Sequence, residues 1–431
     1  MKFKYADKQN EKIKAITEGT LVIGCDIAKA THVARAFDFR GIELGKSLQF
    51  DNTQDGFNSL ALWAKKIMFD NNKPNVMLGI EPTGHYWLSL SQFINESKMA
   101  QLVIVNSYHT KKAKELDDNS PTKDDVKDAK TIAKLVLEGR YSIAHIPTGD
   151  YAELRAGMCQ RQQLQKGLQA IKGLIITWLD RYFPEFTSVY KSFEGKAALT
   201  ILKHFSLPQD ILRPKNETEM EIWRKQIVRY AGVKKTLALE AVARRTVGLK
   251  SAHEFARMEI GYLLMQYEII NEQLTALMEK IKAILVRLPE AKAMLDIPGI
   301  GVITVAGFLA EVGDLKNYRH WRQIIRLAGL NLKTNSSGKH KGKTGITKRG
   351  RHELRALLYR CALALIANNP EFNALHQHLT TRKENPLKGM QSVIAICGKL
   401  IRILFAIGKN QSTYRPEKAF GALIQKQNQA A

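Results

Sequence analysis

LVIGCDIA (residues 21–28) is a short apolar run rich in β-branched side chains, and this pattern predicts a buried strand. The run contains one carboxylate, that of Asp26. An unpaired carboxylate in an apolar strand costs several kcal/mol, so packing alone does not explain this residue. We therefore predict a functional role for Asp26.

The segments that follow alternate between strand and helix patterns. Two more polar, alternating segments joined by Arg40-Gly41 predict antiparallel hairpins. A helical segment then ends before Pro74, and two further apolar strands flank a second helix. The order βββαβαβ predicts an α/β ribonuclease-H-like fold. The segments are THVARAFDF (31–39), IELGKSLQF (42–50), DGFNSLALWAKKIMFD (55–70), VMLGIEP (76–82), HYWLSLSQFINES (85–97) and QLVIVNS (101–107).

The next helix, TKDDVKDAKTIAKL (122–135), starts with acidic residues. Acidic side chains at a helix N-terminus interact favourably with the helix dipole, whatever the function. Asp125 and Asp128 are three residues apart, so both carboxylates leave one face and are placed to meet a divalent cation. Asp124 and Asp128 also share a face, so the pattern alone leaves the choice between Asp124 and Asp125 open.

The expected fold brings these carboxylates together. Its first and fourth strands lie side by side, so Asp26 and Glu81 would be neighbours, and the later helix would bring Asp125 and Asp128 to the same edge. Glu81 precedes Pro82 and ends its strand, so a solvated loop residue is the alternative reading. Four carboxylates at one edge suit two Mg²⁺ ions, which stabilise the attacking and leaving oxygens of a phosphoryl transfer.

The composition indicates a polyanionic partner. The 431 residues carry 66 Lys+Arg against 41 Asp+Glu, a net charge of +25, which favours nucleic acid. This charge is spread along the chain, so an anionic membrane is a weaker candidate. The four cysteines form no CxxC pair, and no run of 18 apolar residues or apolar signal core is present, so we expect a cytoplasmic protein without a zinc site or a membrane span.

Residues 146–290 show little strand signal and predict a long helical region. Within it, apolar side chains alternate at spacings of three and four, the signature of a coiled-coil seam. The pattern favours an intermolecular or hairpin coiled coil, and hence an oligomer, over one amphipathic helix packed inside its own domain. The seam consists of Ile260, Leu263, Tyr267, Ile270, Leu274, Leu277, Ile281, Ile284 and Leu288.

The C-terminal third contains two signals for nucleic-acid binding. LDIPGIGVITVAGFLAEVG (295–313) resembles a helix-hairpin-helix, in which Gly299 and Gly301 would let backbone N–H groups bind a phosphate, although a compact helix–helix connection explains the same glycines. The segment from Lys333 to Arg360 then carries nine Lys/Arg against one acid, Glu353. Its glycines predict a mobile first half, and a helix is expected to start near Arg351. The candidate contacts are Lys333, Lys339, Lys341, Lys343, Lys348, Arg349 and Arg351.

Ser336 and Ser337 lie inside this basic segment. A serine hydroxyl is a poor nucleophile without an activating base, and no relay is evident apart from His340. The chemistry of the sequence alone therefore does not make either serine catalytic.

Taken together, these motifs resemble the IS110/IS1111 family of DEDD insertion-sequence transposases over nearly the whole chain. Each motif is moderately specific, and their common order is strongly specific. They are VIGCDIAKATH, GIEPTGHYW, VNSYHTKKAKE, KDDVKDAKTIA, LDIPGIGVITVAGFLAEVGDLKNY, RLAGLNLKTNSSGKHKG and ITKRGRHELRALLYRCA.

The resemblance implies a set of site residues. The four carboxylates of the family fall on Asp26, Glu81, Asp125 and Asp128, which favours Asp125 over Asp124. The family's catalytic serine precedes a glycine, which points to Ser337, with Ser336 one residue away. The resemblance also implies five regions: a basic extension (1–20), a RuvC-like DEDD domain (21–145), a helical coiled-coil region (146–290), a transposase C-terminal domain with the hairpin and serine loop (291–385), and a C-terminal helix with a basic tail (386–431).

The family mechanism is implied with them. Two Mg²⁺ ions would be held against a DNA phosphate, Ser337 would form a covalent phosphoserine link, and rejoining would need no ATP. A non-coding guide RNA, a dimer or tetramer, and a nucleoid-associated bacterial location follow from the same resemblance. Two rival readings are an endonuclease that resembles Holliday-junction resolvases and uses water, and an inactive nucleic-acid-binding relative.

Overall fold

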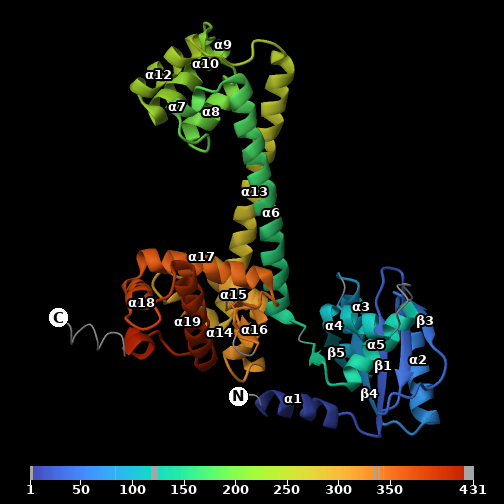
Figure 1. Cartoon of the computed structure of the whole chain (residues 1–431). Coiled ribbons are helices and arrows are strands. Elements are labelled where there is room, and N and C mark those ends of the chain that lie inside the picture. Colours follow the sequence, from blue (N-terminus) through green and yellow to red (C-terminus); the bar gives the residue numbers. More distant parts are fainter. Residues whose placement is uncertain are drawn as a thin grey trace. The chain divides into compact units, whose positions relative to one another are not determined.

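The computed structural model describes residues 3–82, 84–117, 125–144, 146–333, 336–337, 340–342 and 344–421 (Figure 1). The chain divides into two compact units, Met1–Ile146 and Pro147–Ala431, and each is described by itself.

The first unit is built on a mixed sheet of six strands in the order β3-β2-β1-β4-β5-β6. The central pairs β1–β4 and β4–β5 are parallel, whereas β1–β2, β2–β3 and β5–β6 are antiparallel. The adjacency of the first and fourth strands, which the sequence predicted, is confirmed. The strands are β1 (Thr20–Asp26), β2 (Thr31–Phe37), β3 (Leu48–Asp51), β4 (Asn75–Ile80), β5 (Gln101–Val105) and β6 (Tyr141–Ile143).

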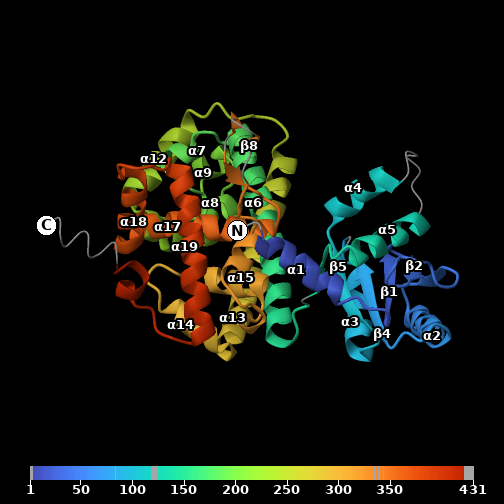
Figure 2. The same ribbon diagram turned by 60° about the horizontal axis from the view of Figure 1, so that its bottom comes forward.

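Helices cover both faces of this sheet (Figure 2). α2 (Gln54–Asp70) and α3 (Trp87–Ser97) pack on one face, where Leu21, Ile23 and Cys25 of β1 point. α5 (Asp125–Leu137) covers the other face, against Val22, and α4 (Ser107–Asp117) packs beside α5. The alternation along β1 therefore buries both sides of one strand, as its continuous apolar run indicated.

Four parts of this unit differ from the expectation. The strand expected over 42–50 is confined to β3, because Gly41 and Gly45 adopt positive φ values of 88° and 74° and bend the chain before it. The sequence did not predict α4, β6 or α1 (Phe3–Lys14). Residues 1–20, expected as a plain basic extension, contain α1, whose Gln9 donates a hydrogen bond to the carbonyl oxygen of Glu138 at 2.9 Å.

The contact between α5 and β1 leaves no room for a side chain at Gly24. A Cβ atom there would lie 2.0 Å from the carbonyl oxygen of Ala129 and 2.6 Å from the amide nitrogen of Ala133. Both are backbone atoms of α5, so no rotamer change relieves the clash. The helix therefore lies directly on the strand that carries Asp26.

We expect Gly24→Ala to push α5 off the sheet and to lower the free energy of unfolding of this unit by about 3 kcal/mol or more. Hydrogen exchange read by mass spectrometry on β1 and α5 peptides measures the change. Gly173→Ala is the control, because a Cβ atom there meets nothing within 4 Å and alanine favours a helix interior. Unchanged protection of β1 in Gly24→Ala would contradict the close contact.

The second unit starts with two long helices that run antiparallel (Figure 1). α6 (Gly149–Tyr182) and α13 (His253–Arg287) are joined by ion pairs near both ends, Asp150 with Arg287 at 2.5 Å and Arg181 with Glu259 at 2.6 Å. Between them the chain forms a small helical domain at one end of the pair. Its helices are α7 (Phe186–Val189), α8 (Lys196–His204), α9 (Pro208–Leu212), α10 (Glu217–Ile222), η1 (Trp223–Val228), α11 (Arg229–Ala231) and α12 (Val233–Arg244).

The heptad seam of α13 packs within the chain. Tyr267 and Leu274 belong to the same buried core as Leu168 and Ile171 of α6, and Ile270 approaches Gly167. Further along, Ile281 lies beside Gly157. α6 of the same chain therefore covers the stripe expected as a coiled-coil seam.

The rest of the second unit is a helical bundle with one apolar core. Its helices are α14 (Pro289–Leu295), α15 (Val302–Val312), η2 (Leu315–Asn317), α16 (Arg322–Leu327), α17 (His352–Asn368), α18 (Pro370–Thr381) and α19 (Gly389–Asn410). The helix expected near Arg351 is thus confirmed as α17. By length and composition alone α19 passes for a membrane span, but its buried face, with Ile396, Leu400 and Leu404, packs into this core.

The basic segment before α17 is more regular than its glycines indicated. β7 (Leu332–Lys333) pairs with β10 (Gly345–Ile346), and β8 (Ser336–Ser337) pairs with β9 (His340–Lys341), both antiparallel. Gly342 directly follows β9, and Gly345 is itself a paired position of β10.

Candidate functional site

Asp26 is positioned by the alternation of β1. It is the last residue of the strand and follows the parity of Val22 and Gly24, which face α5. Its carboxylate therefore faces the helix instead of the core formed with α2 and α3. Asp26 is only partly buried, although it belongs to an apolar strand, because β1 ends at this residue.

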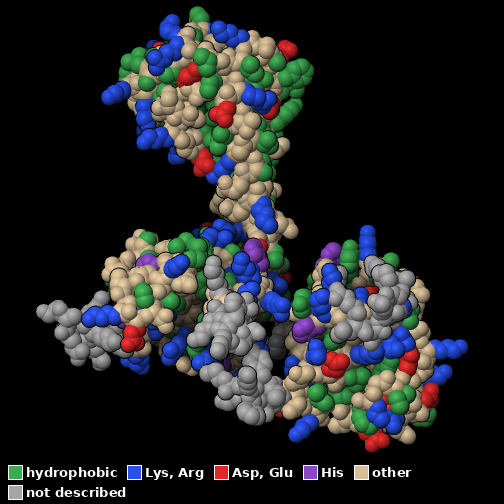
Figure 3. Space-filling model, in the orientation of Figure 1, with side chains coloured by type: hydrophobic (Ala, Val, Ile, Leu, Met, Phe, Trp, Pro, Cys, Tyr) green, Lys and Arg blue, Asp and Glu red, His purple; other side chains and the backbone are tan. Residues whose placement is uncertain are grey.

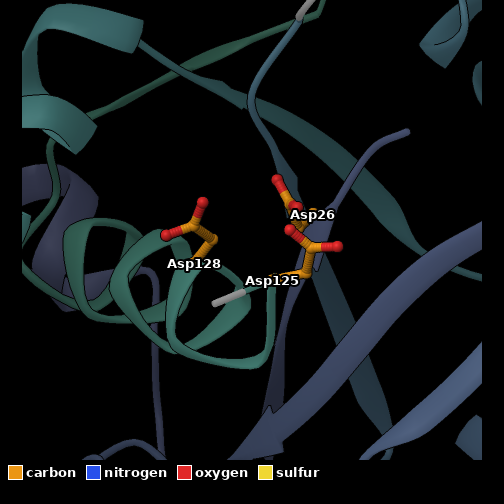
Figure 4. Close-up of side chains that lie close together, drawn as sticks. All are labelled: Asp26, Asp125 and Asp128. Carbon is orange, nitrogen blue, oxygen red and sulfur yellow. The ribbon is translucent and has the colours of Figure 1, made fainter. Parts of the chain in front are cut away.

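α5 supplies two further carboxylates from its first turn. Asp125, Asp128 and Asp26 place ligand oxygens within 4.8 Å of one another (Figure 4). Arg35 of β2 steadies this turn by donating a hydrogen bond to the carbonyl oxygen of Val126 at 3.2 Å. Asp26 precedes Asp125 by 99 positions in the sequence. The contact between the sheet and α5 therefore creates the cluster.

Glu81 lies next to this group but outside it. β4 pairs with β1 in parallel, with Ile80 opposite Cys25, so Glu81 and Asp26 are the next residues along the two strands. Its negative charge contributes to raising the pKa of Asp26. β4 ends at Ile80 and Pro82 follows Glu81 at once, so Glu81 lies just beyond the strand.

The electrostatics of the cluster are unfavourable without a cation. Burial, followed by the charges of Asp128 and Asp125, raises the pKa of Asp26 to about 6. The folded chain thus binds this proton more tightly than the unfolded chain. Protonated Asp26 therefore contributes to the stability of the folded state at low pH. This contribution is lost as the pH rises through about 6 and Asp26 becomes charged.

One cation of the chain already lies at the site. Lys114 of α4 forms an ion pair with Asp128, and its charge lowers the pKa of Asp26 against the other causes. Lys114 lies in VNSYHTKKAKE, one of the motifs that carry the family resemblance, but the motif alone does not indicate a role for this lysine. The signal for this role was the spacing of the lysines along α4, the helix that packs against α5.

The donor set suits a hard divalent ion. Three carboxylates from two elements, with Glu81 beside them, offer oxygen ligands only, which Mg²⁺ and Mn²⁺ prefer. The raised pKa of Asp26 has the same origin, since negative charges crowd at a place where a positive charge would relieve them.

The serine and most of the basic contacts lie in the second unit. Ser337 stands opposite His340 in the ladder of β8 and β9. Lys339 and Lys343 lie outside the described residues, as does Asp124, and Lys341 is described only in its backbone. Lys333 and Lys348 are exposed at the base of the same segment.

Arg351, one of the candidate phosphate contacts, is partly buried and hydrogen-bonded within the chain. It donates hydrogen bonds to the carbonyl oxygen of Glu311 and, at 3.4 Å, to its carboxylate. Burial and the charge of Arg155 lower the pKa of its guanidinium. Arg349 next to it is exposed.

The PGIG turn connects α14 to α15. Gly299 has a φ of 90°, and a Cβ atom there would lie 3.0 Å from Leu365. Asn369 donates a hydrogen bond from its side chain to the carbonyl oxygen of Pro298 at 3.1 Å. Gly301 is the N-cap of α15, and a Cβ atom built on it would meet nothing within 4 Å. The turn is therefore packed at Gly299 and open at Gly301.

Two segments of the chain match family models. Residues 23–184 match the model of the IS110-type DEDD transposases, described as a transposase. Residues 291–377 match the model of the transposase IS116/IS110/IS902 family.

Three relatives illustrate the similarity. The transposase for insertion sequence element IS1111A of Coxiella burnetii is 30% identical over 144 residues, 32% of this chain and 38% of the relative. The transposase for IS1328 of Yersinia enterocolitica is 33% identical over 125 residues, 28% of this chain and 37% of the relative. An uncharacterised 43.6 kDa protein of insertion element IS110 from Streptomyces coelicolor is 22% identical over 302 residues, 69% of this chain and 74% of the relative. The first two matches thus span less than two fifths of the relatives' own length.

The mixed sheet, its covering helices and the acidic cluster define a ribonuclease-H-like DEDD domain of the transposase class, a class that implies the use of a divalent metal. The second match lies in the helical C-terminal part, in the order that the motifs predicted. The chain belongs to the IS110 family of insertion-sequence transposases, which confirms the resemblance stated from its motifs.

We expect metal affinity to fall with acidity, because a proton on Asp26 competes with the ion. With its pKa raised to about 6, Mn²⁺ should bind about tenfold more weakly at pH 5 than at pH 7.5. Titration calorimetry across this range measures the effect. Asp26→Asn should bind weakly at every pH, and a wild-type affinity that stays level between these pH values would contradict the cluster's electrostatics.

Proposed function

We propose that this protein is a DNA transposase that cuts and rejoins strands through its carboxylate site and a serine nucleophile. The convergence of Asp26, Asp125 and Asp128 at one edge of the sheet carries the proposal. The two family matches, in the same order as in a transposase chain, support it.

The metal site is proposed to comprise Asp26, Glu81, Asp125 and Asp128 with two Mg²⁺ ions. Bound ions of this kind stabilise charge on the attacking and leaving oxygens of a phosphoryl transfer. The carboxylates would hold these ions beside the scissile phosphate. Lys114 would release Asp128 when the site is filled, since one ammonium and the ions compete for the same oxygens.

Ser337 is the proposed nucleophile. Its hydroxyl oxygen would attack the phosphorus atom, the bond from phosphorus to one deoxyribose oxygen would break, and that oxygen would leave with a proton. The phosphodiester is thereby exchanged for a phosphoserine ester. Attack by a hydroxyl of another DNA end would reverse the exchange, so rejoining needs no ATP.

We expect wild-type protein with Mg²⁺, a flanking RNA of its element and a labelled target duplex to form a protein–DNA adduct that survives SDS. Ser337→Ala should lose the adduct, because the attacking oxygen is gone, whereas the matched control Ser336→Ala should keep it. Denaturing gels read the result. Asp26→Asn should lose both adduct and cleavage.

The same gel separates the serine reaction from its rival. An endonuclease that resembles Holliday-junction resolvases would use these carboxylates with water and leave nicked DNA. Free nicked product without adduct in all the serine variants would contradict the proposed nucleophile while leaving the carboxylate site in place.

Sequence specificity is proposed to come from a guide RNA. The net charge of +25 suits a complex that holds RNA and DNA together. Base pairing would select the sites, and Lys333, Lys348 and the other basic residues of the segment would contact backbone phosphates.

A homo-oligomer is the last part of the proposal, and a second stripe on α13 supports it. Phe255, Met258, Tyr262, Met265 and Ile269 recur at spacings of three and four and are all 45% exposed or more. Hydrophobic side chains gather along the outer side of this part of α13 (Figure 3). This stripe lies on the face of α13 away from α6 and has the spacing of a coiled-coil seam. Its partner would be the same stripe on α13 of another copy of the chain.

We expect the triple variant Met258→Lys, Tyr262→Lys and Met265→Lys to raise the dissociation constant of the oligomer at least about tenfold, because buried lysines repel across the symmetry axis. Light scattering after size exclusion measures it. Leu237→Lys on α12, 59% exposed and off the stripe, is the control. A triple variant with the mass of the wild type would rule out this stripe as the interface.

A further inference from the structure

The helical domain between α6 and α13 contains a pocket that neither family match covers. The matches end at residue 184 and resume at residue 291. The pocket has a volume of about 590 Å³ and lies between α7, α8, α11 and α12. This volume falls in the range of small-ligand sites and is large enough for one nucleotide.

The pocket is positively charged. Lys191, Lys196 and Lys235 line it, and no Asp or Glu is among the residues of its lining. A carboxylate is close in sequence, Glu194, but it is engaged in an ion pair with Lys172. Within the described residues, none of these three lysines forms an ion pair. Lysine and arginine side chains gather over α7 and α12 on this side of the domain (Figure 3).

The N-terminus of α8 opens into the same pocket. Gly195 caps the helix without a side-chain hydrogen bond, and Gly195, Lys196, Ala197 and Ala198 all line the pocket. The first N–H groups of a helix have no partner within it, and the helix dipole adds positive potential there. Both features favour an anion.

A buried hydroxyl supports the same reading independently. Tyr190 lines the pocket and is only 8% exposed, yet its hydroxyl group has no hydrogen-bond partner among the described residues. Burial raises its pKa, so the hydroxyl keeps its proton and remains a donor. A buried donor without an acceptor is costly, and a bound phosphate oxygen would satisfy it.

An aromatic platform lies at the pocket. Tyr230 lines it and is 57% exposed, with Lys196 Nζ 5.7 Å from its ring centroid. Lys235 lies likewise 5.8 Å from the ring of Tyr190. An exposed ring beside cations is the arrangement on which unpaired bases stack in single-strand-binding proteins.

We propose that this pocket binds single-stranded nucleic acid, with one phosphate at the N-terminus of α8 and the adjacent base on Tyr230. The phosphate takes donors from the α8 backbone, from Tyr190 and from the lysines. A duplex keeps its bases stacked inside, so its bases do not reach Tyr230. The phosphate and the base are shared by RNA and DNA, and the experiment distinguishes the two.

The test uses the full chain in EDTA, so that the carboxylate site does not contribute. Labelled single strands of about 15 nucleotides, oligo-U and oligo-dT, are compared with a duplex by anisotropy and by ultraviolet crosslinking mapped with mass spectrometry. We expect a crosslink at Tyr230 with a single strand and none with the duplex. The stronger of the two single-strand arms identifies RNA or DNA as the occupant.

Two variants separate stacking from charge. Tyr230→Ala should weaken single-strand binding about tenfold and leave the salt dependence unchanged. The double variant Lys196→Ala and Lys235→Ala should weaken binding and reduce the slope of log affinity against log salt by about 0.7, the value for one phosphate contact. Lys225→Ala is the matched control, because Lys225 pairs with Glu221 on the same domain outside the pocket.

Absence of any crosslink at Tyr230, or an equal crosslink with the duplex, would overturn the proposal. Unchanged affinity and slope in both variants would do the same. Either result leaves the transposase proposal untouched, since that proposal depends on the carboxylates and the serine and is read by cleavage and adduct formation with Mg²⁺.

Discussion

The packing of α5 directly on β1 is the contact on which the candidate site depends. Gly24 permits it, since any side chain there would meet backbone atoms of α5. Without that approach the first turn of the helix would stand away from the end of the strand. Asp125 and Asp128 would then not come within 4.8 Å of Asp26, and the oxygen ligands would be dispersed over the surface.

The same contact places like charges close together, and a bound cation would relieve the resulting electrostatic strain. Burial and two neighbouring carboxylates raise the pKa of Asp26 to about 6, so the metal-free site is destabilised at neutral pH. Lys114 relieves part of the repulsion through Asp128. A site that is strained alone and relieved by a cation binds that cation more strongly, which is the usual exchange of stability for function.

α13 of the second unit presents two different apolar faces. The seam of α13 is occupied by α6, whereas the exposed stripe from Phe255 to Ile269 lies on another face of the same helix. The pair ends in a small helical domain that lies between the two family-matched segments and holds a basic pocket with a buried, unsatisfied hydroxyl. The stripe proposed for assembly and the pocket proposed for nucleic acid thus lie on different surfaces of the segment between the two family matches.

Much of the first unit could be predicted from the sequence, because strand and helix periodicity, the apolar run at 21–28 and the anomalous Asp26 are local signals. The heptad of α13 was also visible, but periodicity does not say which partner covers a stripe, and here α6 covers it. Lys114, the stripe from Phe255 and the pocket around Tyr190 likewise could not be predicted. Each depends on which side chains meet across elements distant in sequence, and only tertiary packing decides that.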